Sequence, residues 1–381
     1  MERPSGRSNL TILAWVLALA ALGIYAWTSS FGRTTHGFIA YYAAARLLIT
    51  GQLGAHVFDD AWFMTYVRTL TRTDVLEIYG PNTPMMAWLA APVALFAPMT
   101  ARAVWIVVSI AAFAAAVSWL ARETRSTLHP VLLFLLIVNP PVLANLRTGQ
   151  AYLFVAAVYA VIAVLLLRQR DGAAGVALGL ILALKAAGAP LLVFLAFQRR
   201  WRACAAAVGA AALAAVVTAF WVDGDLWSEY LAYVPAFLNR PTIAVTANQS
   251  LVGWARRFGD LGPTAPLAIL AAAVLFSAWR TSASAPGTWI AAGVVMTLLF
   301  APVAEDHHFA AAVVPLLLMD RRPRAAWLIV AALLMVPLRW TAFRFTADWP
   351  ALLAYPRLYG TVLLAGLASA SNTAERAEQR T

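Results

Sequence analysis

Apolar runs of bilayer length recur along almost the whole chain. A helix needs about 20 mostly apolar residues to cross a membrane, and only helices or closed barrels satisfy their backbone polar groups there. The 381 residues are 62% hydrophobic and 12% charged. They predict an all-α, polytopic transmembrane helix bundle of roughly 10–12 membrane segments. We place the spans near Leu10–Ser29, Pro84–Pro98, Ala103–Ala121, Val131–Ala144, Ala151–Leu167, Ala173–Phe197, Ala203–Val222, Pro266–Trp279, Trp289–Val303, Phe309–Met319, Ala325–Leu338 and Ala351–Ala368.

Arginine clusters predict the orientation, because short loops rich in Lys and Arg stay in the cytoplasm. The clusters at residues 168–170, 199–202 and 321–324, with the tail 371–381, are expected inside. Residues 34–81 and 223–263 then form two outer loops of a single transmembrane domain, residues 1–370. Arg122 and Arg125 also look cytoplasmic, but counting the two preceding spans puts them outside. Either one of those spans is re-entrant or the charge rule fails there.

The same features predict where the protein resides. An Ala- and Arg-rich composition suggests a multi-pass protein of the bacterial inner membrane, and Arg3 and Arg7 precede an apparently uncleaved first helix. The single cysteine, Cys204, cannot form a disulfide within the chain. The net charge of +11 resides in loops between spans, so membrane lipids are expected partners and nucleic acid is not.

Lys185 is the only lysine, and it lies inside the apolar run Gly172–Phe197. A charged amine at membrane depth costs about 2.5 kcal/mol or more unless it meets a partner or water. Arginines flank the run on both sides, which favours a hairpin of two half-length helices turning near Lys185–Pro190. The hairpin would carry Lys185 to about mid-membrane and line a cavity there. The alternative is a lysine that snorkels to an interface.

The first outer loop carries two helical patterns. Apolar residues recur at helical spacing from Phe38 to Ile49 and again from Trp62 to Leu70, and Gly51 suits a helix end. These patterns predict an ordered loop with two amphipathic helices on the outer membrane surface. Helices that simply pack against the bundle are the equal alternative.

Most titratable side chains are predicted on the outer side. Glu305-Asp306-His307-His308 is the densest cluster of them. It could be a metal site or, equally, the polar cap of a helix, and no third remote ligand is evident. Polar residues with Arg147 at a span boundary suit a phosphate or a sugar. No Gly-rich phosphate loop, CxxC or HExxH motif is present.

Several short motifs follow one another along the chain: Phe38–Gly51, Tyr79–Pro84, Gly149-Gln150, Ala174–Lys185, Gln198–Trp201, Asn248-Gln-Ser250 and Asp306-His307-His308. Together they resemble glycosyltransferase family 87, whose GT-C-type membrane enzymes include polyprenyl-phosphate-mannose-dependent mannosyltransferases. The resemblance covers about residues 10–340. The family usually has an Asp, the expected catalytic base, before the Phe of its first-loop motif, whereas this chain has Gly37.

The resemblance implies a GT-C-like enzyme that transfers a hexose, with mannose as the first candidate, from a polyprenyl-phosphate carrier to a glycan or glycolipid on the outer face. Asp59 or Asp60 is the expected base, with Asp306, His307 and His308 as further catalytic candidates. No cofactor or metal is expected. The alternative is a non-catalytic binder or transporter of lipid-linked sugar that has lost the loop Asp. The expected substrate-binding residues are Lys185, Arg147, Gln150, Asn145, Tyr41, Tyr42, Arg46, Tyr79, Asn82 and Asn248.

Overall fold

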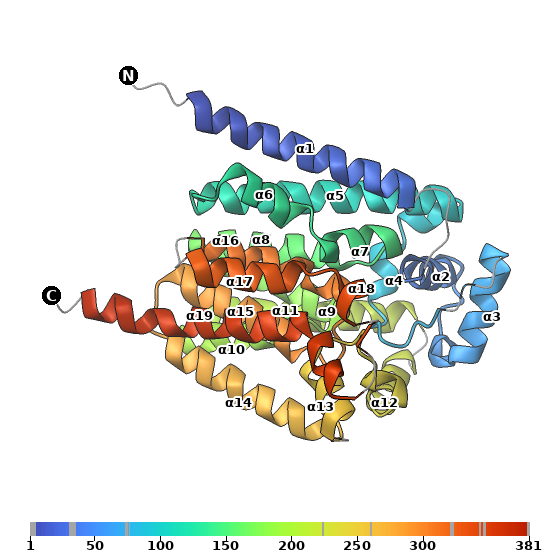
Figure 1. Ribbon diagram of the computed structural model, residues 1–381. Coiled ribbons are helices and arrows are strands. Elements are labelled where there is room, and N and C mark those ends of the chain that lie inside the picture. Colours follow the sequence, from blue (N-terminus) through green and yellow to red (C-terminus); the bar gives the residue numbers. More distant parts are fainter. Residues whose placement is uncertain are drawn as a thin grey trace.

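The computed structural model describes residues 5–29, 36–72, 75, 77–222, 225–259, 261–320, 324–342, 344–345 and 348–378. The predicted loop boundaries at residues 34 and 223 and the arginines at 321 and 322 lie outside these ranges. Every regular element within them is helical. Helix α1 begins and α19 ends at one end of the bundle, the terminal end, while α2, α3, α12 and α13 lie at the opposite end, the loop end (Figure 1).

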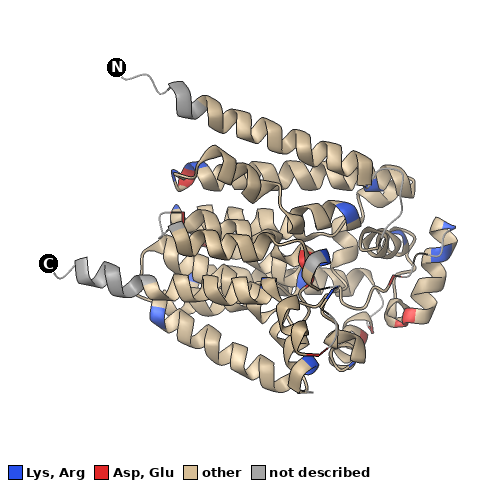
Figure 2. Ribbon diagram, in the orientation of Figure 1, with Lys and Arg blue, Asp and Glu red and all other residues tan. Residues whose placement is uncertain are grey.

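The long helices form the body of the bundle, and most charged residues lie toward its two ends (Figure 2). Among the described residues, five helical segments are long and apolar enough to cross a membrane: α1, α5, α6 with α7, α11 and α14. Helix α11 spans about 32 Å and carries exposed tryptophans at both ends, as expected at two membrane interfaces. The protein is therefore a polytopic helical membrane protein, and the count of 10–12 segments stays a prediction.

The helices of the bundle body are α1 (Ser5–Ser29), α5 (Pro98–Glu123), α6 (Pro130–Ile137), α7 (Pro140–Thr148), α8 (Tyr152–Leu167), α9 (Asp171–Lys185), α10 (Ala189–Phe197), α11 (Trp201–Trp221), α14 (Thr264–Thr281), α15 (Pro286–Phe300), η4 (Asp306–Ala312), α16 (Val313–Leu318), α17 (Arg324–Met335) and α19 (Pro356–Glu378).

The predicted span Pro84–Pro98 is wrong. It folds into two short helices, α4 (Met86–Ala90) and η2 (Val93–Leu95), because Pro92 and Pro98 lack the N–H that a continuous helix would use. The Tyr42 hydroxyl and the Arg46 guanidinium bond the carbonyls of Phe96 and Ala94 and fasten this segment to α2.

The same correction removes the conflict over Arg122 and Arg125. Helix α5 starts at the loop end and finishes at the terminal end, where Glu123 pairs with Arg168 at 2.6 Å. Arg122 therefore lies at the same end as the arginine cluster that follows α8.

The predicted hairpin after Gly172 is confirmed. Helix α9 ends at Lys185, a three-residue turn reverses the chain, and α10 returns. The Arg200–Asp171 ion pair, 2.6 Å long, joins the starts of α11 and α9, so both arginine clusters lie on one side. A Cβ on Gly179 would overlap the Ala207 carbonyl of α11, so the two helices touch backbone to backbone.

The first loop contains the two predicted helices, α2 (Phe38–Ile49) and α3 (Asp60–Thr71), joined through η1 (Ala55–Phe58). Residues 38–45 of α2 are all buried, so this helix packs inside the loop end instead of lying on a membrane surface. Helix α3 is amphipathic, with Phe63 and Val67 buried. The remaining short elements are α12 (Leu226–Leu238), η3 (Pro241–Ala244), α13 (Leu251–Gly259), α18 (Leu338–Thr341) and η5 (Trp349–Ala354).

Candidate functional site

Lys185 is held by polar side chains of the first loop. Its Nζ donates to the Asn82 Oδ1 at 2.6 Å and to the Tyr41 Oη at 2.9 Å. The ammonium also lies 4.6 Å from the centre of the Tyr41 ring and 5.2 Å from that of Tyr152, where ring faces attract a cation. These contacts place Lys185 against protein groups at the loop end, whereas a snorkelling lysine would reach toward an interface.

The Tyr79–Pro84 motif fixes the position of that lysine. The Thr83 Oγ1 donates to the carbonyls of Ala183 (2.6 Å) and Leu184 (2.9 Å) in the last turn of α9. The Asn82 Nδ2 donates to the Tyr79 carbonyl, so its Oδ1 points toward Lys185. The Tyr79 hydroxyl is buried and donates to Thr83. The motif therefore couples the first loop to the end of α9.

Glu77 lies on the other side of this network. The backbone N–H of Gly37 donates to its Oε2, and that of Ile78 to its Oε1 at 3.1 Å. The Tyr41 hydroxyl, which accepts from Lys185, donates to the Gln150 Oε1, and Gln150 in turn borders Gly37. The Glu77 side chain is 15% exposed, with the His36 Nδ1 3.8 Å from its Oε2. Burial raises the pKa of Glu77, and the N–H groups of Gly37 and Ile78 oppose this.

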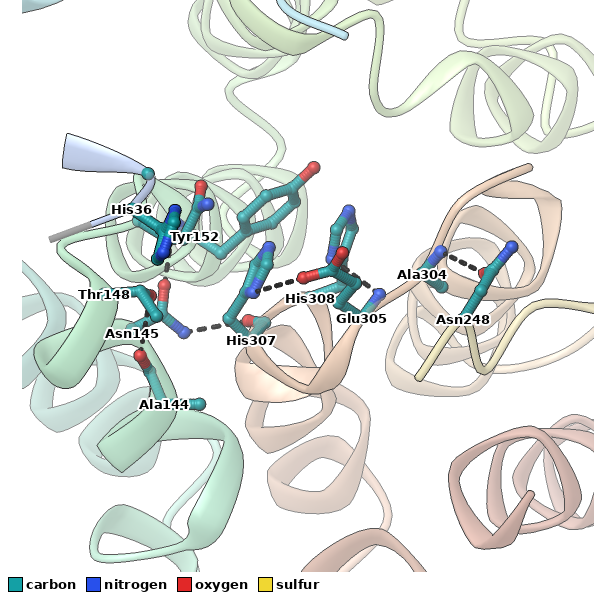
Figure 3. Close-up of polar contacts among 12 residues, drawn as sticks. His36, Ala144, Asn145, Thr148, Tyr152, Asn248, Ala304, Glu305, His307 and His308 are labelled. Carbon is teal, nitrogen blue, oxygen red and sulfur yellow. Dashed lines mark hydrogen bonds and ion pairs between the residues drawn. The ribbon is translucent and has the colours of Figure 1, made fainter. Parts of the chain in front are cut away.

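The cluster Glu305–His308 begins η4 and forms a helix cap, one of its two predicted roles. The Glu305 N–H donates to the His308 Nδ1 at 3.1 Å, while the Glu305 carboxylate accepts from the His308 backbone. The His307 Nδ1 lies 3.7 Å from the Glu305 Oε2. The Tyr152 ring packs on His308 with centroids 3.9 Å apart (Figure 3). The Lys185 Nζ lies 5.2 Å from the centre of the same ring, so one tyrosine contacts both Lys185 and the imidazoles.

Two asparagines hold this segment from opposite sides (Figure 3). The Asn145 Nδ2 donates to the carbonyls of Pro141 and His307, and its Oδ1 accepts from the Tyr152 N–H. The Asn248 Oδ1 accepts from Ala304 at 3.0 Å and from Ser250. Asn145 uses both of its amide hydrogens within the protein, and Asn248 uses one on the Ile243 carbonyl, so both amides position the imidazole segment.

Three predicted catalytic acids make structural contacts. Asp59 caps α3 by accepting from the Ala61 and Trp62 N–H groups, and Asp60 pairs with Arg240 at 2.6 Å. Asp306 pairs with the fully buried Arg357 at 2.8 Å. These pairs tie α3 to the region after α12, and η4 to α19.

The other predicted residues divide into two groups. Tyr41, Asn82, Gln150 and Lys185 come together in one network, and the two histidines adjoin it through Tyr152. Tyr42, Arg46 and Tyr79 pack the loop end together, and Arg147 is exposed at the end of α7.

Sequence reasoning left four residues out of the site: His36, Glu77, Tyr152 and Glu305. Two of them could have been found by their position next to a predicted motif, because Glu77 stands two residues before Tyr79 and Glu305 adjoins Asp306. Within the part of the chain that the structure describes, no three His, Cys, Asp or Glu side chains converge as metal ligands do.

The sequence profile of glycosyltransferase family 87 matches residues 81–302, which is more than half of the chain. The chain belongs to this family. No curated protein and no solved structure shows detectable similarity to it. The matched part of this family 87 chain contains Asn82, Gln150, Tyr152 and Lys185, whereas Tyr41, Glu77 and the Glu305–His308 cluster lie outside the match. The protein is therefore a membrane glycosyltransferase, and its polar network at the loop end is the candidate active site.

Proposed function

We propose that this family 87 protein transfers a hexose, with mannose as the first candidate, from a polyprenyl-phosphate carrier to a glycan or glycolipid. The observation that carries the proposal is the Lys185 network. In a chain of this family, an amine held by an amide and a tyrosine hydroxyl, with imidazoles and the Glu77 carboxylate within electrostatic range, suits a phosphorylated sugar donor.

The loop end is proposed to face the non-cytoplasmic side of the bacterial inner membrane. Arg122, Arg168 and Arg200 gather at the terminal end, and the positive-inside rule assigns such clusters to the cytoplasm. The donor's polyprenyl chain would then lie in the lipid beside the bundle, with its phosphate and sugar at the polar network. This location also fits the proposed acceptors, which are membrane-bound or periplasmic glycans.

The reaction is a displacement at the anomeric carbon. An acceptor hydroxyl attacks, the bond between that carbon and the phosphate oxygen breaks, and polyprenyl phosphate leaves with the electron pair. Preorganised cationic and hydrogen-bonding groups stabilise the charge that develops on the leaving phosphate. Lys185 supplies an ammonium that uses two of its three donors on Asn82 and Tyr41, which leaves one for a phosphate oxygen. His307 and His308 are placed to donate as well.

A binder or transporter of lipid-linked sugar is the second candidate, and it rested on the missing first-loop Asp. The argument from the missing Asp is weakened because the Glu77 carboxylate accepts from the Gly37 N–H, which places an acid at the start of α2.

Transfer by the purified protein tests the proposal. Protein in lipid nanodiscs is incubated with radiolabelled polyprenyl-phosphate mannose and a membrane glycolipid extract, and labelled products are separated by chromatography. We expect transfer by the parent, a loss of about 100-fold in Lys185→Met, and partial retention in Lys185→Arg, which keeps the charge. Stoichiometric donor binding without any transfer would establish the binder instead.

A further inference from the structure

We propose that Glu77 is the general base that accepts the proton of the acceptor hydroxyl, an assignment that rests on the proposed transfer reaction. The structure holds its carboxylate in one orientation, with Oε2 on the Gly37 N–H and Oε1 on the Ile78 N–H. Each oxygen keeps a further lone pair for an incoming hydroxyl. The side chain is 15% exposed, so the carboxylate is fixed but reachable.

The residue at position 37 makes room for this carboxylate. Gly37 has φ of 85°, a backbone conformation that favours glycine. A Cβ there would lie 2.5 Å from the Gln150 Nε2 and 3.0 Å from the Thr148 carbonyl oxygen. A side chain at position 37 would therefore strain the backbone and displace the Gln150 amide, and the acid comes instead from a residue 40 positions later in the chain.

Other acids near the loop end are less suited to the role. Asp59 caps a helix, while the carboxylates of Asp60 and Asp306 are occupied by ion pairs with Arg240 and Arg357. Glu305 is 55% exposed and caps η4. Glu77 lies at the backbone of Gly37, next to Gln150, and Gln150 bonds the tyrosine that holds Lys185. This places a base and a cation on two sides of one network.

The step balances with groups already named. The Glu77 carboxylate takes the acceptor's proton as the hydroxyl oxygen bonds to the anomeric carbon, and the bond from that carbon to the donor's phosphate oxygen breaks. The electron pair leaves with polyprenyl phosphate, beside Lys185. The protonated Glu77 then returns its proton to water, which reaches the exposed His36 beside it.

The surroundings of Glu77 predict how the transfer rate depends on pH. Burial raises the pKa of Glu77 above the ordinary 4.5, while the N–H groups of Gly37 and Ile78, and then His36 and Lys185, oppose the shift. Tyr41 and Glu305 are the other titratable groups that interact with it. A base must be deprotonated to act, so the rate should fall as pH drops through the raised pKa, at a higher pH than for a solvated glutamate.

The test compares Glu77→Gln with the parent in single-turnover transfer from radiolabelled polyprenyl-phosphate mannose. We expect a loss of about 100-fold or more in rate, the usual scale for a general base, with donor affinity unchanged. Glu229→Gln removes an exposed carboxylate of α12 and should match the parent. Glu77→Asp keeps the carboxylate on a shorter stem and should retain part of the rate.

Each result decides something different. A Glu77→Gln variant within about threefold of the parent rate overturns the assignment, since a general base contributes far more. If neither Glu77 variant accumulates in membranes, the parent's own pH–rate profile decides. A transfer rate that falls with decreasing pH above the ordinary glutamate pKa of 4.5 supports Glu77 as the base. A rate that stays constant down to pH 4.5 overturns the assignment. A parent that transfers no sugar refutes the proposed function itself, which is a separate failure.

Discussion

Single atoms determine the shape of the site at Gly37 and Asn145. The missing Cβ of Gly37 leaves the space that Gln150 occupies, and the backbone N–H of Gly37 donates to Glu77. Asn145 uses both amide hydrogens and its oxygen to join α7, the start of α8 and η4. Neither residue needs to touch a substrate to control where the reacting groups lie.

Restoring an Asp at position 37 is expected to harm the protein. Gly37→Asp would force a side chain into a left-handed conformation against Gln150 and Thr148, a strain of about 1–3 kcal/mol. We expect a lower thermal midpoint in detergent and slower transfer, and Gly37→Ala should share most of the defect because the clash begins at Cβ. Higher activity in Gly37→Asp than in the parent would contradict the Glu77 assignment.

Asn145→Ala should disturb the imidazoles from a distance. The change leaves the His307 carbonyl and the Tyr152 N–H without their partner, at about 1–3 kcal/mol for each buried group. We expect a lower thermal midpoint and at least an order-of-magnitude loss of transfer rate with little change in donor KM. Asn239→Ala, which removes an exposed amide bonded to Pro235, is the matched control.

At the scale of elements, the contact between α9 and α11 sets the position of Lys185. Gly175 and Gly179 let the two backbones meet, and Ala206 and Ala210 of α11 lie within 2.8 and 2.7 Å of the positions where Cβ atoms would be. The hydrophobic effect does not drive helices together within lipid, so close packing of small residues contributes more to helix association there than in water. Thr83 then fastens the last turn of α9 to the first loop.

Gly179→Leu should separate these helices. Its side chain would collide with the backbone of α11, whereas a Cβ at Gly209 meets nothing within 4 Å, so Gly209→Leu is the control. We expect overpacking to cost about 1–3 kcal/mol or more, which a reduced monodisperse fraction after heating in detergent would report. Equal stability of the two variants would show that the contact is not a constraint.

At the scale of the whole molecule, the bundle separates arginine-rich turns from the polar network. The Glu123–Arg168 and Arg200–Asp171 pairs mark the terminal end, while the Asp60–Arg240 pair joins the two predicted outer loops at the other. This separation would confine the proposed lipid-linked donor and its acceptor to one face.

Cysteine labelling tests that orientation. In a Cys204→Ala background, Gln52→Cys at the loop end should react with a membrane-impermeant maleimide added to intact cells, because this end is proposed to face outward. Ala285→Cys, between α14 and α15, should react only after permeabilisation. The reverse pattern would put the site in the cytoplasm and exclude the proposed acceptors.

The sequence by itself determined the helical class, the positions of most helices and the hairpin that turns at Lys185, because hydrophobic length and arginine placement are local properties. The prediction failed at Pro84–Pro98, because it considered only the apolar composition of this segment. Prolines interrupt the helix there, and contacts with α2 stabilise the short helices that form instead. The sequence predicted Lys185, Tyr41, Asn82 and Gln150 as site residues, but not that they touch. Only tertiary structure brought Glu77 to Gly37 and Tyr152 to His308, since contacts between distant positions leave no periodic pattern along the chain.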